Sequence, residues 1–164
     1  MLKHYDFIPF GTTDLPVGAS LIFAPHPDDE TFGLGGSILQ LTDQNQTVNV
    51  VMMTDTATRK EELLKATELL SVNDVHFLGA RDGDLQVNTL NIKAIINLIE
   101  KYSPDHIFFP SPLEYHPDHR ATAWLVWDAL QCIDFSVNVF SYEIANQSPV
   151  NMLVDVTSEM KKKI

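Results

Sequence analysis

Residues 19–30 read ASLIFAPHPDDE, an apolar run that ends in proline and is followed at once by one histidine and three carboxylates. A short, nearly continuous apolar run is typical of a β-strand that is covered on both faces. Runs of the same kind occupy residues 48–54, 74–79, 105–110 and 137–142, and residues 152–156 are a sixth candidate. The opening stretch therefore predicts a buried strand that leads into a cluster of polar side chains.

Amphipathic stretches separate the apolar runs. Apolar residues recur at helical spacing over residues 30–43, 59–71, 89–102 and 118–131. Alternating strands and helices predict an α/β domain, a three-layer Rossmann-like arrangement with a mainly parallel sheet, right-handed crossovers and helices on both faces. In such sheets ligands bind beyond the carboxyl ends of the strands, so the residues that follow each strand are the first candidates for a site.

Composition narrows the class of protein. The chain has 164 residues, with 11 Lys and Arg against 22 Asp and Glu, and a formal net charge of −11. This charge argues against nucleic acid and anionic membrane surfaces as partners, and no apolar run approaches the ~20 residues of a membrane span. Residues 1–18 lack the apolar core of a secretory signal peptide. Cys132 is the only cysteine, so the chain cannot form an internal disulfide and nothing suggests an oxidising compartment. We expect a cytoplasmic protein with an N-terminal arm over residues 1–18 and one domain over residues 19–164.

Two histidine-containing clusters follow predicted strands. His26 and Asp29 lie three residues apart after the first strand, and His116 and His119 lie three apart after the fourth. The clusters can converge although about 90 residues separate them, because parallel strands end at one edge of the sheet. His26, Asp29 and one histidine of the second pair would form a three-ligand site with an open position, which is typical of catalytic zinc. Asp28 would then lie beside the metal.

Each motif also has a simpler interpretation when it is taken alone. A His-Pro-Asp segment is commonly a turn, and a His-x-x-His pair on a helix is often incidental, but their joint placement favours a metal site. Gly33, Gly35 and Gly36 could suggest a phosphate loop, yet no lysine follows them, so close backbone packing is the preferred interpretation. Trp124 and Trp127 are expected in the core.

The two motifs together resemble those of the LmbE-like (PIG-L) metal-dependent deacetylases. The resemblance covers residues 19–157 and rests on APHPDDE at residues 24–30, the glycines that follow, and HPDHR at residues 116–120. Members of that family remove acetyl groups from N-acetylglucosamine-type amines of small glycosides, glycolipids and antibiotic precursors. At the C-terminus the chain resembles the start of a closing helix that then stops, so the deacetylase domain over residues 19–164 is short for the family, as a truncated domain would be.

The resemblance implies a role for each residue of the two clusters. It places the Zn²⁺ ligands at His26, Asp29 and His119, with one ion per chain and another divalent metal as the alternative. It places the general base at Asp28, and at His116 an imidazolium that assists the oxyanion or the leaving group. Asp28 would accept a proton from the metal-activated water, and the products would be a free amine and acetate.

Weaker matches imply a substrate-binding side. Asp55 follows the second strand, Arg59 opens an RxxE segment, and Asp82 belongs to an RDG segment. The alternative for all three is a solvated loop charge or a helix-capping charge. The expected substrate is a small-molecule N-acetylated glycoside, and the sequence selects neither its identity nor the oligomeric state.

Two other functions fit the same residues. Two histidines and one carboxylate also form the facial triad of non-haem iron enzymes, although those sites are usually built on β-barrels. A non-catalytic, metal-stabilised carbohydrate-binding or interaction module, or a truncated deacetylase, is the other alternative. Metal analysis separates the iron enzyme from the zinc enzyme, and glycan binding without turnover would identify the module.

Overall fold

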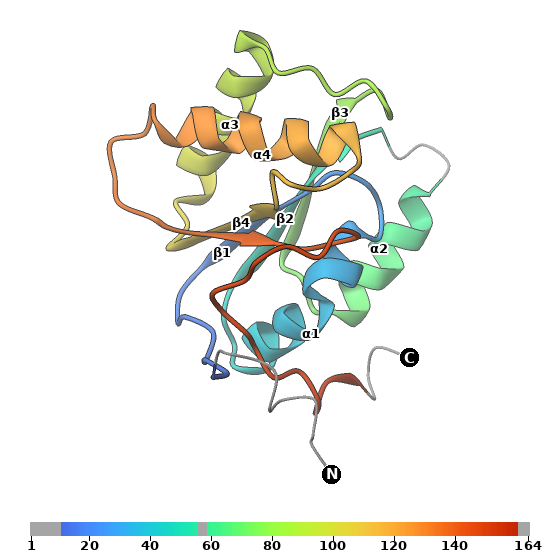
Figure 1. The fold of residues 1–164 in the computed structure, drawn as a ribbon, viewed down its shortest axis with the longest axis vertical. Coiled ribbons are helices and arrows are strands. Elements are labelled where there is room, and N and C mark those ends of the chain that lie inside the picture. Colours follow the sequence, from blue (N-terminus) through green and yellow to red (C-terminus); the bar gives the residue numbers. More distant parts are fainter. Residues whose placement is uncertain (1–10, 56–58, 161–164) are drawn as a thin grey trace.

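The structure is a computed structural model that describes residues 11–55 and 59–160. Strands and helices alternate along the described chain, as the sequence predicts (Figure 1). The elements are β1 (Ser20–Ala24), α1 (Asp29–Asp43), β2 (Val48–Thr54), α2 (Lys60–Leu69), β3 (Asp74–Ala80), α3 (Thr89–Tyr102), β4 (His106–Pro110), α4 (Pro117–Leu130) and β5 (Asn138–Tyr142).

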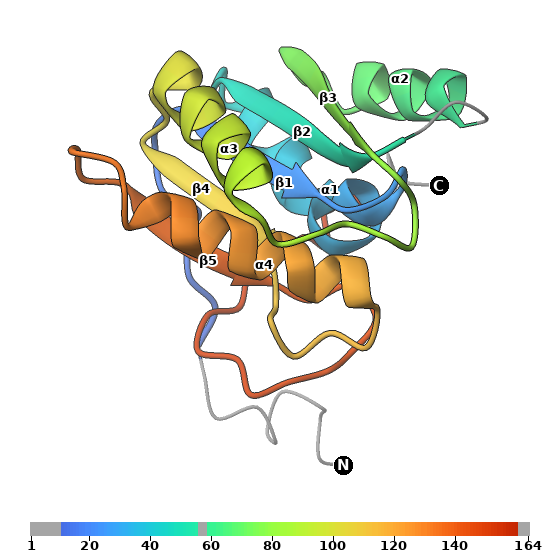
Figure 2. The same cartoon turned by 90° about the horizontal axis from the view of Figure 1, so that it is seen from above.

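The five strands form one sheet in the order β3-β2-β1-β4-β5, and every pair is parallel. Helices α1 and α2 cover one face, whereas α3 and α4 cover the other (Figures 1 and 2). The predicted three-layer α/β fold is therefore confirmed. The strand order reverses between β1 and β4, and the two strands that precede the histidine clusters are neighbours at this switch point.

Burial on both faces explains why the strands are almost wholly apolar. In β1, Leu21 and Phe23 contribute to the core beneath α3 and α4, while Ile22 and Ala24 contribute to the core beneath α1 and α2. All five residues of β1 are buried. Full burial of a medium-sized apolar side chain stabilises a fold by about 1.5–3 kcal/mol, so the two cores hold the end of this strand firmly in place.

Close packing explains the glycines of α1. A Cβ atom on Gly33 would lie 2.5 Å from the ring of Tyr142, and one on Gly36 would lie 2.6 Å from Cβ of Val156. The absence of side chains thus lets α1 approach β5 and the segment that follows it. The expectation of close backbone packing is confirmed at these two positions.

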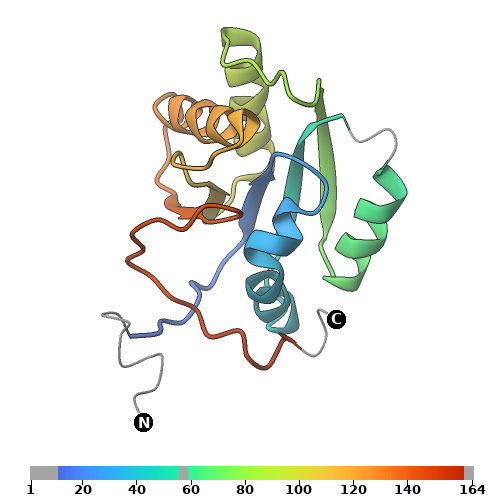
Figure 3. The same ribbon diagram turned by 45° about the vertical axis from the view of Figure 1, so that its right-hand side comes forward.

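The sixth predicted strand, residues 152–156, is not formed. After β5 the chain leaves the sheet and runs past α1 (Figure 3). Leu153 makes a single parallel bridge to Thr12, and the Asp155 carbonyl accepts a hydrogen bond from Gln40 of α1 at 2.6 Å. The apolar side chains of this segment pack on a helix instead of pairing with a strand.

Part of the predicted N-terminal arm is attached to the domain. Besides the Thr12 bridge, the Val17 carbonyl lies 3.0 Å from Nε2 of His106, and the Gly18 amide donates to Gln46 at 2.9 Å. Residues 1–10 of the arm lie outside the described residues.

The prediction that Trp124 and Trp127 belong to the core is wrong. Both lie on α4 and are about half exposed, at 52% and 51%. The buried residues of α4 include Ala121, Leu125 and Ala129, which recur every four residues, and the two tryptophans lie off this stripe.

Among the described residues, no helix has the length and apolar character that crossing a membrane requires.

Candidate metal centre

The first cluster forms a tight turn between β1 and α1. Asp28 is the N-cap of α1 and has φ 99° and ψ −23°, a backbone conformation that Asp and Asn adopt more readily than branched residues do. The next residue, Asp29, accepts a hydrogen bond from the His26 backbone amide through Oδ2 at 2.9 Å. This bond closes the turn and directs the side chains of His26 and Asp29 to the same place.

The second cluster begins α4 next to the first. His116 is the N-cap of α4, and its Nδ1 accepts the amide of Asp118 at 3.2 Å. The ring of His26 lies 4.6 Å from that of His116 and 5.3 Å from that of His119, between centroids. Adjacent strand ends therefore bring the two motifs together, as the parallel sheet predicts.

One carboxylate oxygen lies between two imidazoles. Oδ2 of Asp29 is 3.1 Å from Nδ1 of His26 and 3.2 Å from Nε2 of His119. Asp29 and His119 are both only 5% exposed, and His26 is half-buried. The three predicted ligands thus converge on one point.

The donor atoms suit a divalent metal. Ligand atoms of His26, His116 and His119 lie within 4.8 Å of one another, as do those of His26, Asp82 and Asp118. The first set differs from the predicted one by containing His116 in place of Asp29. Imidazole nitrogens with carboxylate oxygens are the donors that Zn²⁺ and related divalent ions bind, so the residues present fit such an ion. We favour Asp29 over His116 as the third ligand, because one Asp29 oxygen faces both His26 and His119.

The charges in the cluster are strongly coupled. Burial alone would lower the pKa of His26, but hydrogen bonds to Asp29 and Asp118 outweigh burial and raise it to about 9. Burial would raise the pKa of Asp29, yet hydrogen bonds from His119 and His26 lower it to about 2. The carboxylates attract positive charge to this point, which a proton on His26 supplies when no metal is bound.

His116 has the opposite tendency. Burial lowers its pKa below the ordinary value, and the neighbouring charge of His26 lowers it further. The lowered pKa favours the neutral imidazole when no metal is bound, whereas the resemblance implies an imidazolium at this position during the reaction. Since its Nδ1 accepts a backbone amide, the proton of the neutral ring is on Nε2.

Two further carboxylates face His26. Oδ2 of Asp118 lies 3.0 Å from Nε2 of His26. The same oxygen accepts a hydrogen bond from the amide of Gly83 at 2.7 Å, and Oδ1 accepts one from the amide of Leu85 at 3.0 Å. Oδ1 of Asp82 lies 3.2 Å from the same nitrogen, on a side chain that is 71% exposed. Asp118 is thus a buried partner that orients His26.

The guanidinium of Arg59 holds the predicted general base. Its Nη2 donates to Oδ2 of Asp28 at 3.1 Å, and its Nη1 donates to the Pro27 carbonyl at 2.9 Å. Glu62 receives two more hydrogen bonds from Arg59, both at 3.1 Å. Sequence reasoning identified the RxxE pair as a substrate-side feature but did not predict its contact with Asp28.

A cavity of about 320 Å³ opens over this cluster. Seven of the eight predicted site residues line it, together with Pro27; the seven are His26, Asp28, Asp29, Asp55, Arg59, Asp82 and His116. His119 lies behind Asp29. The predicted catalytic, metal-binding and substrate-binding residues are therefore gathered in one place.

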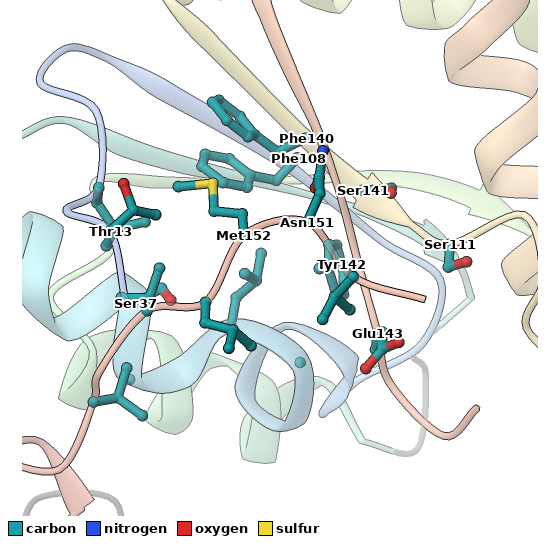
Figure 4. A pocket seen from close by; sticks show the side chains of 18 of the residues that line it. Thr13, Ser37, Phe108, Ser111, Phe140, Ser141, Tyr142, Glu143, Asn151 and Met152 are labelled. Atoms are coloured by element: carbon teal, nitrogen blue, oxygen red, sulfur yellow. The ribbon is translucent and has the colours of Figure 1, made fainter. Parts of the chain in front are cut away.

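A larger cavity, of about 850 Å³, lies elsewhere. It is bounded by α1, β5 and the segment over residues 148–156, and its lining includes Phe108, Phe140 and Met152 (Figure 4). None of the three clustered histidines lines it. The smaller cavity is consequently the candidate active site, because it contains the donor atoms.

Comparison with known proteins agrees with this geometry. The family model described as PIG-L, GlcNAc-PI de-N-acetylase, matches residues 21–130, which include both histidine clusters. The chain belongs to the PIG-L family. Its fold is also that of the conserved protein TT1542 from Thermus thermophilus, with a TM-score of 0.83 at 22% identity over 90% of this chain and 76% of that one.

Two relatives have names that state an activity. The chain is 33% identical over 128 residues to diacetylchitobiose deacetylase of Thermococcus kodakarensis, covering 67% of this chain and 48% of the relative. It is 31% identical over 147 residues to the probable N-acetyl-alpha-D-glucosaminyl L-malate deacetylase 2 of Bacillus anthracis, covering 76% and 65%. The PIG-L chain described here thus matches about half to two thirds of the length of these relatives.

Proposed function

We propose that residues 19–164 form a zinc-dependent de-N-acetylase domain, with residues 1–18 as an N-terminal arm. The substrate is a small glycoside that carries an N-acetylglucosamine-type acetamide. Membership of the PIG-L family and the names of the two relatives support the reaction class. The observation that carries the proposal is the position of Asp28, which lines the same cavity as His26 and Asp29, with His119 in contact with Asp29.

His26, Asp29 and His119 would hold the metal through the atoms that face one another. These atoms are Oδ2 of Asp29, Nδ1 of His26 and Nε2 of His119. Zn²⁺ bound there would polarise the acetamide carbonyl and lower the pKa of a coordinated water. Zinc is the preferred ion for a site made of imidazole and carboxylate, and iron remains the chemical alternative.

The remaining steps belong to side chains of this protein. Asp28 faces the cavity with 38% of its side chain exposed, so its carboxylate can accept a proton from the attacking water and return it to the leaving nitrogen. His116 presents a protonated Nε2, which can donate a hydrogen bond to the developing oxyanion. Arg59 fixes Oδ2 of Asp28, and the other oxygen of the carboxylate would accept the proton.

The cavity limits the substrate that we propose. Its volume of about 320 Å³ is at the lower end of small-molecule sites, which suits one sugar ring at the metal with the rest of the glycoside outside. Asp55 and Asp82 line the cavity and are exposed, and carboxylates of this kind accept hydrogen bonds from sugar hydroxyls. The exposed free thiol of Cys132 suits a reducing compartment, so we place the protein in the cytoplasm.

Acetate release tests the proposal. The zinc-loaded and the chelator-treated protein are each incubated with N-acetylglucosamine, N,N′-diacetylchitobiose and N-acetylglucosaminyl malate, and acetate and free amine are measured. We expect zinc-dependent release from at least one compound. Replacing Asp28 by Asn should reduce the rate about 10²- to 10⁴-fold while zinc content is unchanged, since a general base contributes that much.

The control and the contradicting outcomes separate the alternatives. Asp134→Asn removes an exposed carboxylate beyond the C-terminal end of α4 and should leave the rate unchanged. Full activity of Asp28→Asn would disprove the assignment of the general base. Glycan binding without acetate release from fully zinc-loaded protein would identify the non-catalytic module, and stoichiometric iron in anaerobically purified protein would favour the iron enzyme.

A further inference from the structure

Glu114 lies outside both motifs and yet ends beside the proposed metal centre. It belongs to the connection between β4 and α4 and is 1% exposed. Its Oε2 lies 3.6 Å from Nδ1 of His119, the ring nitrogen that faces away from Asp29. That nitrogen is itself buried and has no hydrogen-bond partner within the described part of the chain. A buried carboxylate and a buried, unpaired imidazole nitrogen therefore face each other.

Backbone amides hold the Glu114 carboxylate from its other side. Its Oε1 accepts the amides of Ile144 at 2.7 Å, Ala145 at 3.3 Å and Asn146 at 3.4 Å, all in the loop that follows β5. The Ala145 amide also lies 3.2 Å from Oε2. Three amides compensate part of the cost of burying this carboxylate and fix its orientation. Oε2 is consequently the oxygen left to face His119.

The tautomer of His119 connects these contacts to the metal. A neutral imidazole has one N–H, and the nitrogen that binds a metal must carry the lone pair. When Nε2 of His119 binds the metal beside Asp29, the proton has to be on Nδ1, where a buried N–H needs an acceptor. Oε2 of Glu114 is the acceptor in place, and shortening the gap by about 0.5 Å would bring it within hydrogen-bond range.

His26 shows the same arrangement in completed form. Its Nδ1 faces Asp29, while its Nε2 lies 3.0 Å from Asp118, a carboxylate that also accepts the amides of Gly83 and Leu85. Each proposed imidazole ligand thus has a buried carboxylate behind it, and each carboxylate is held by backbone amides of a neighbouring loop. The repeated pattern indicates that both carboxylates orient the imidazole in front of them.

We propose that Glu114 is a positioning residue that selects the Nδ1–H tautomer of His119 and keeps its Nε2 available to the metal. The same carboxylate couples the loop over residues 144–146 to the centre, because one side chain holds both. The inference rests on the proposed metal site but not on deacetylation. Loss of such an outer partner typically weakens metal binding about 10- to 100-fold.

The test replaces Glu114 by Gln and measures zinc affinity by competition with a chelator. The amide keeps an oxygen for the loop amides but turns an NH₂ group toward His119, which favours the Nε2–H tautomer that cannot bind zinc through Nε2. We expect the dissociation constant for zinc to rise about 10- to 100-fold. In zinc-loaded protein, the Nδ1–H proton of His119 should be protected from exchange with water in the wild type and should exchange faster in Glu114→Gln.

Glu143→Gln is the matched control. Glu143 also holds the chain after β5, through the amide and hydroxyl of Ser148 at 2.5 and 2.8 Å, but no contact joins it to a histidine among the described residues. This variant should keep the zinc affinity and the His119 tautomer of the wild type. If Glu143→Gln lost as much zinc affinity as Glu114→Gln, general loosening of the loop would explain both losses. That result would overturn the proposal.

Wild-type protein alone can also refute the inference. If the Nδ1–H proton of His119 in zinc-loaded wild type exchanges freely with water, Glu114 does not hold this tautomer. Wild-type zinc affinity in a folded Glu114→Gln variant would refute it equally. These readouts need no turnover, so a chain that releases no acetate but loses zinc affinity in Glu114→Gln supports this inference while the proposed function fails.

Discussion

Oδ2 of Asp118 lies 3.0 Å from Nε2 of His26, although the two residues are 92 positions apart in the chain. The contact exists because β1 and β4 are paired in parallel and end at the same edge of the sheet. It joins the two histidine motifs directly, so neither motif can move without disturbing the other. Metal binding, catalysis and stability should therefore respond to changes in either motif and in the packing that supports them.

Zinc should stabilise the folded chain, and Asp29 should be required. At a free zinc concentration about 100 times the dissociation constant, binding to the native state alone adds about 2.7 kcal/mol to the free energy of unfolding. Asp29→Asn should lose most of this increment, because Asp29 presents an oxygen to both His26 and His119. Thermal unfolding with zinc and with chelator measures the difference. An undiminished zinc effect in Asp29→Asn would remove Asp29 from the ligand set.

Arg59→Ala should lower kcat about tenfold with little change in KM. The guanidinium holds Oδ2 of Asp28 and the Pro27 carbonyl, so its loss releases the proposed general base without removing a metal ligand. Arg59→Lys should restore only part of the rate, since an ammonium group cannot reproduce the planar set of donors. Lys65→Ala on α2 is the control. A change confined to KM would instead support direct substrate binding, the interpretation that the sequence favoured.

Gly36→Ala should destabilise the protein by about 1–3 kcal/mol, the usual cost of overpacking. The added methyl group would lie 2.6 Å from Cβ of Val156, in the segment that follows β5. Helix propensity alone predicts the opposite effect, because replacing Gly by Ala in a helix raises the free energy of unfolding by about 1 kcal/mol. Urea unfolding decides between them, with Gly11→Ala as control because nothing lies within 4 Å of that position. A stabilised Gly36→Ala variant would show that the segment does not press on α1.

The pH dependence of stability should include a contribution from His76 of β3. Burial lowers the pKa of His76 below its unfolded value of 6.5, and the charge of Lys101 lowers it further. Between the two pKa values the unfolded chain binds the extra proton, so this contribution is fully present above pH 6.5 and is lost as pH falls through the folded pKa. In chelator, wild type should lose more stability than His76→Gln between pH 7 and pH 5. Equal losses would contradict the prediction.

The sequence predicted the parts of the fold that periodicity determines. Five strands and four helices follow from apolar runs and helical spacing, and the site followed from the rule that parallel strands share an edge. Trp124 and Trp127 were misassigned because a hydrophobicity pattern cannot tell which side of an amphipathic helix meets the sheet when large apolar residues lie on both. Residues 152–156 were misassigned because an apolar run also suits packing on α1.

Contacts between side chains were the least predictable part of the site. Nothing in the spacing of Glu114 links it to the loop over residues 144–146, since that contact depends on where β5 ends. The hydrogen bond from Arg59 to Asp28 likewise depends on the turn at Asp28 and on the position at which α2 starts. Residue types therefore indicated the donors of the proposed metal centre, whereas the tertiary structure was needed to show which groups orient them.

The pairing of β1 with β4 also has a consequence for the order of folding. Every other strand pair joins neighbours in the sequence of strands, whereas this pair brings together Ser20 and His106 across three helices and two strands. His26 follows one of these strands and His119 follows the other. A refolding chain can therefore assemble the proposed zinc site only after its two halves have docked, so the rate at which zinc is captured during refolding should report that docking step.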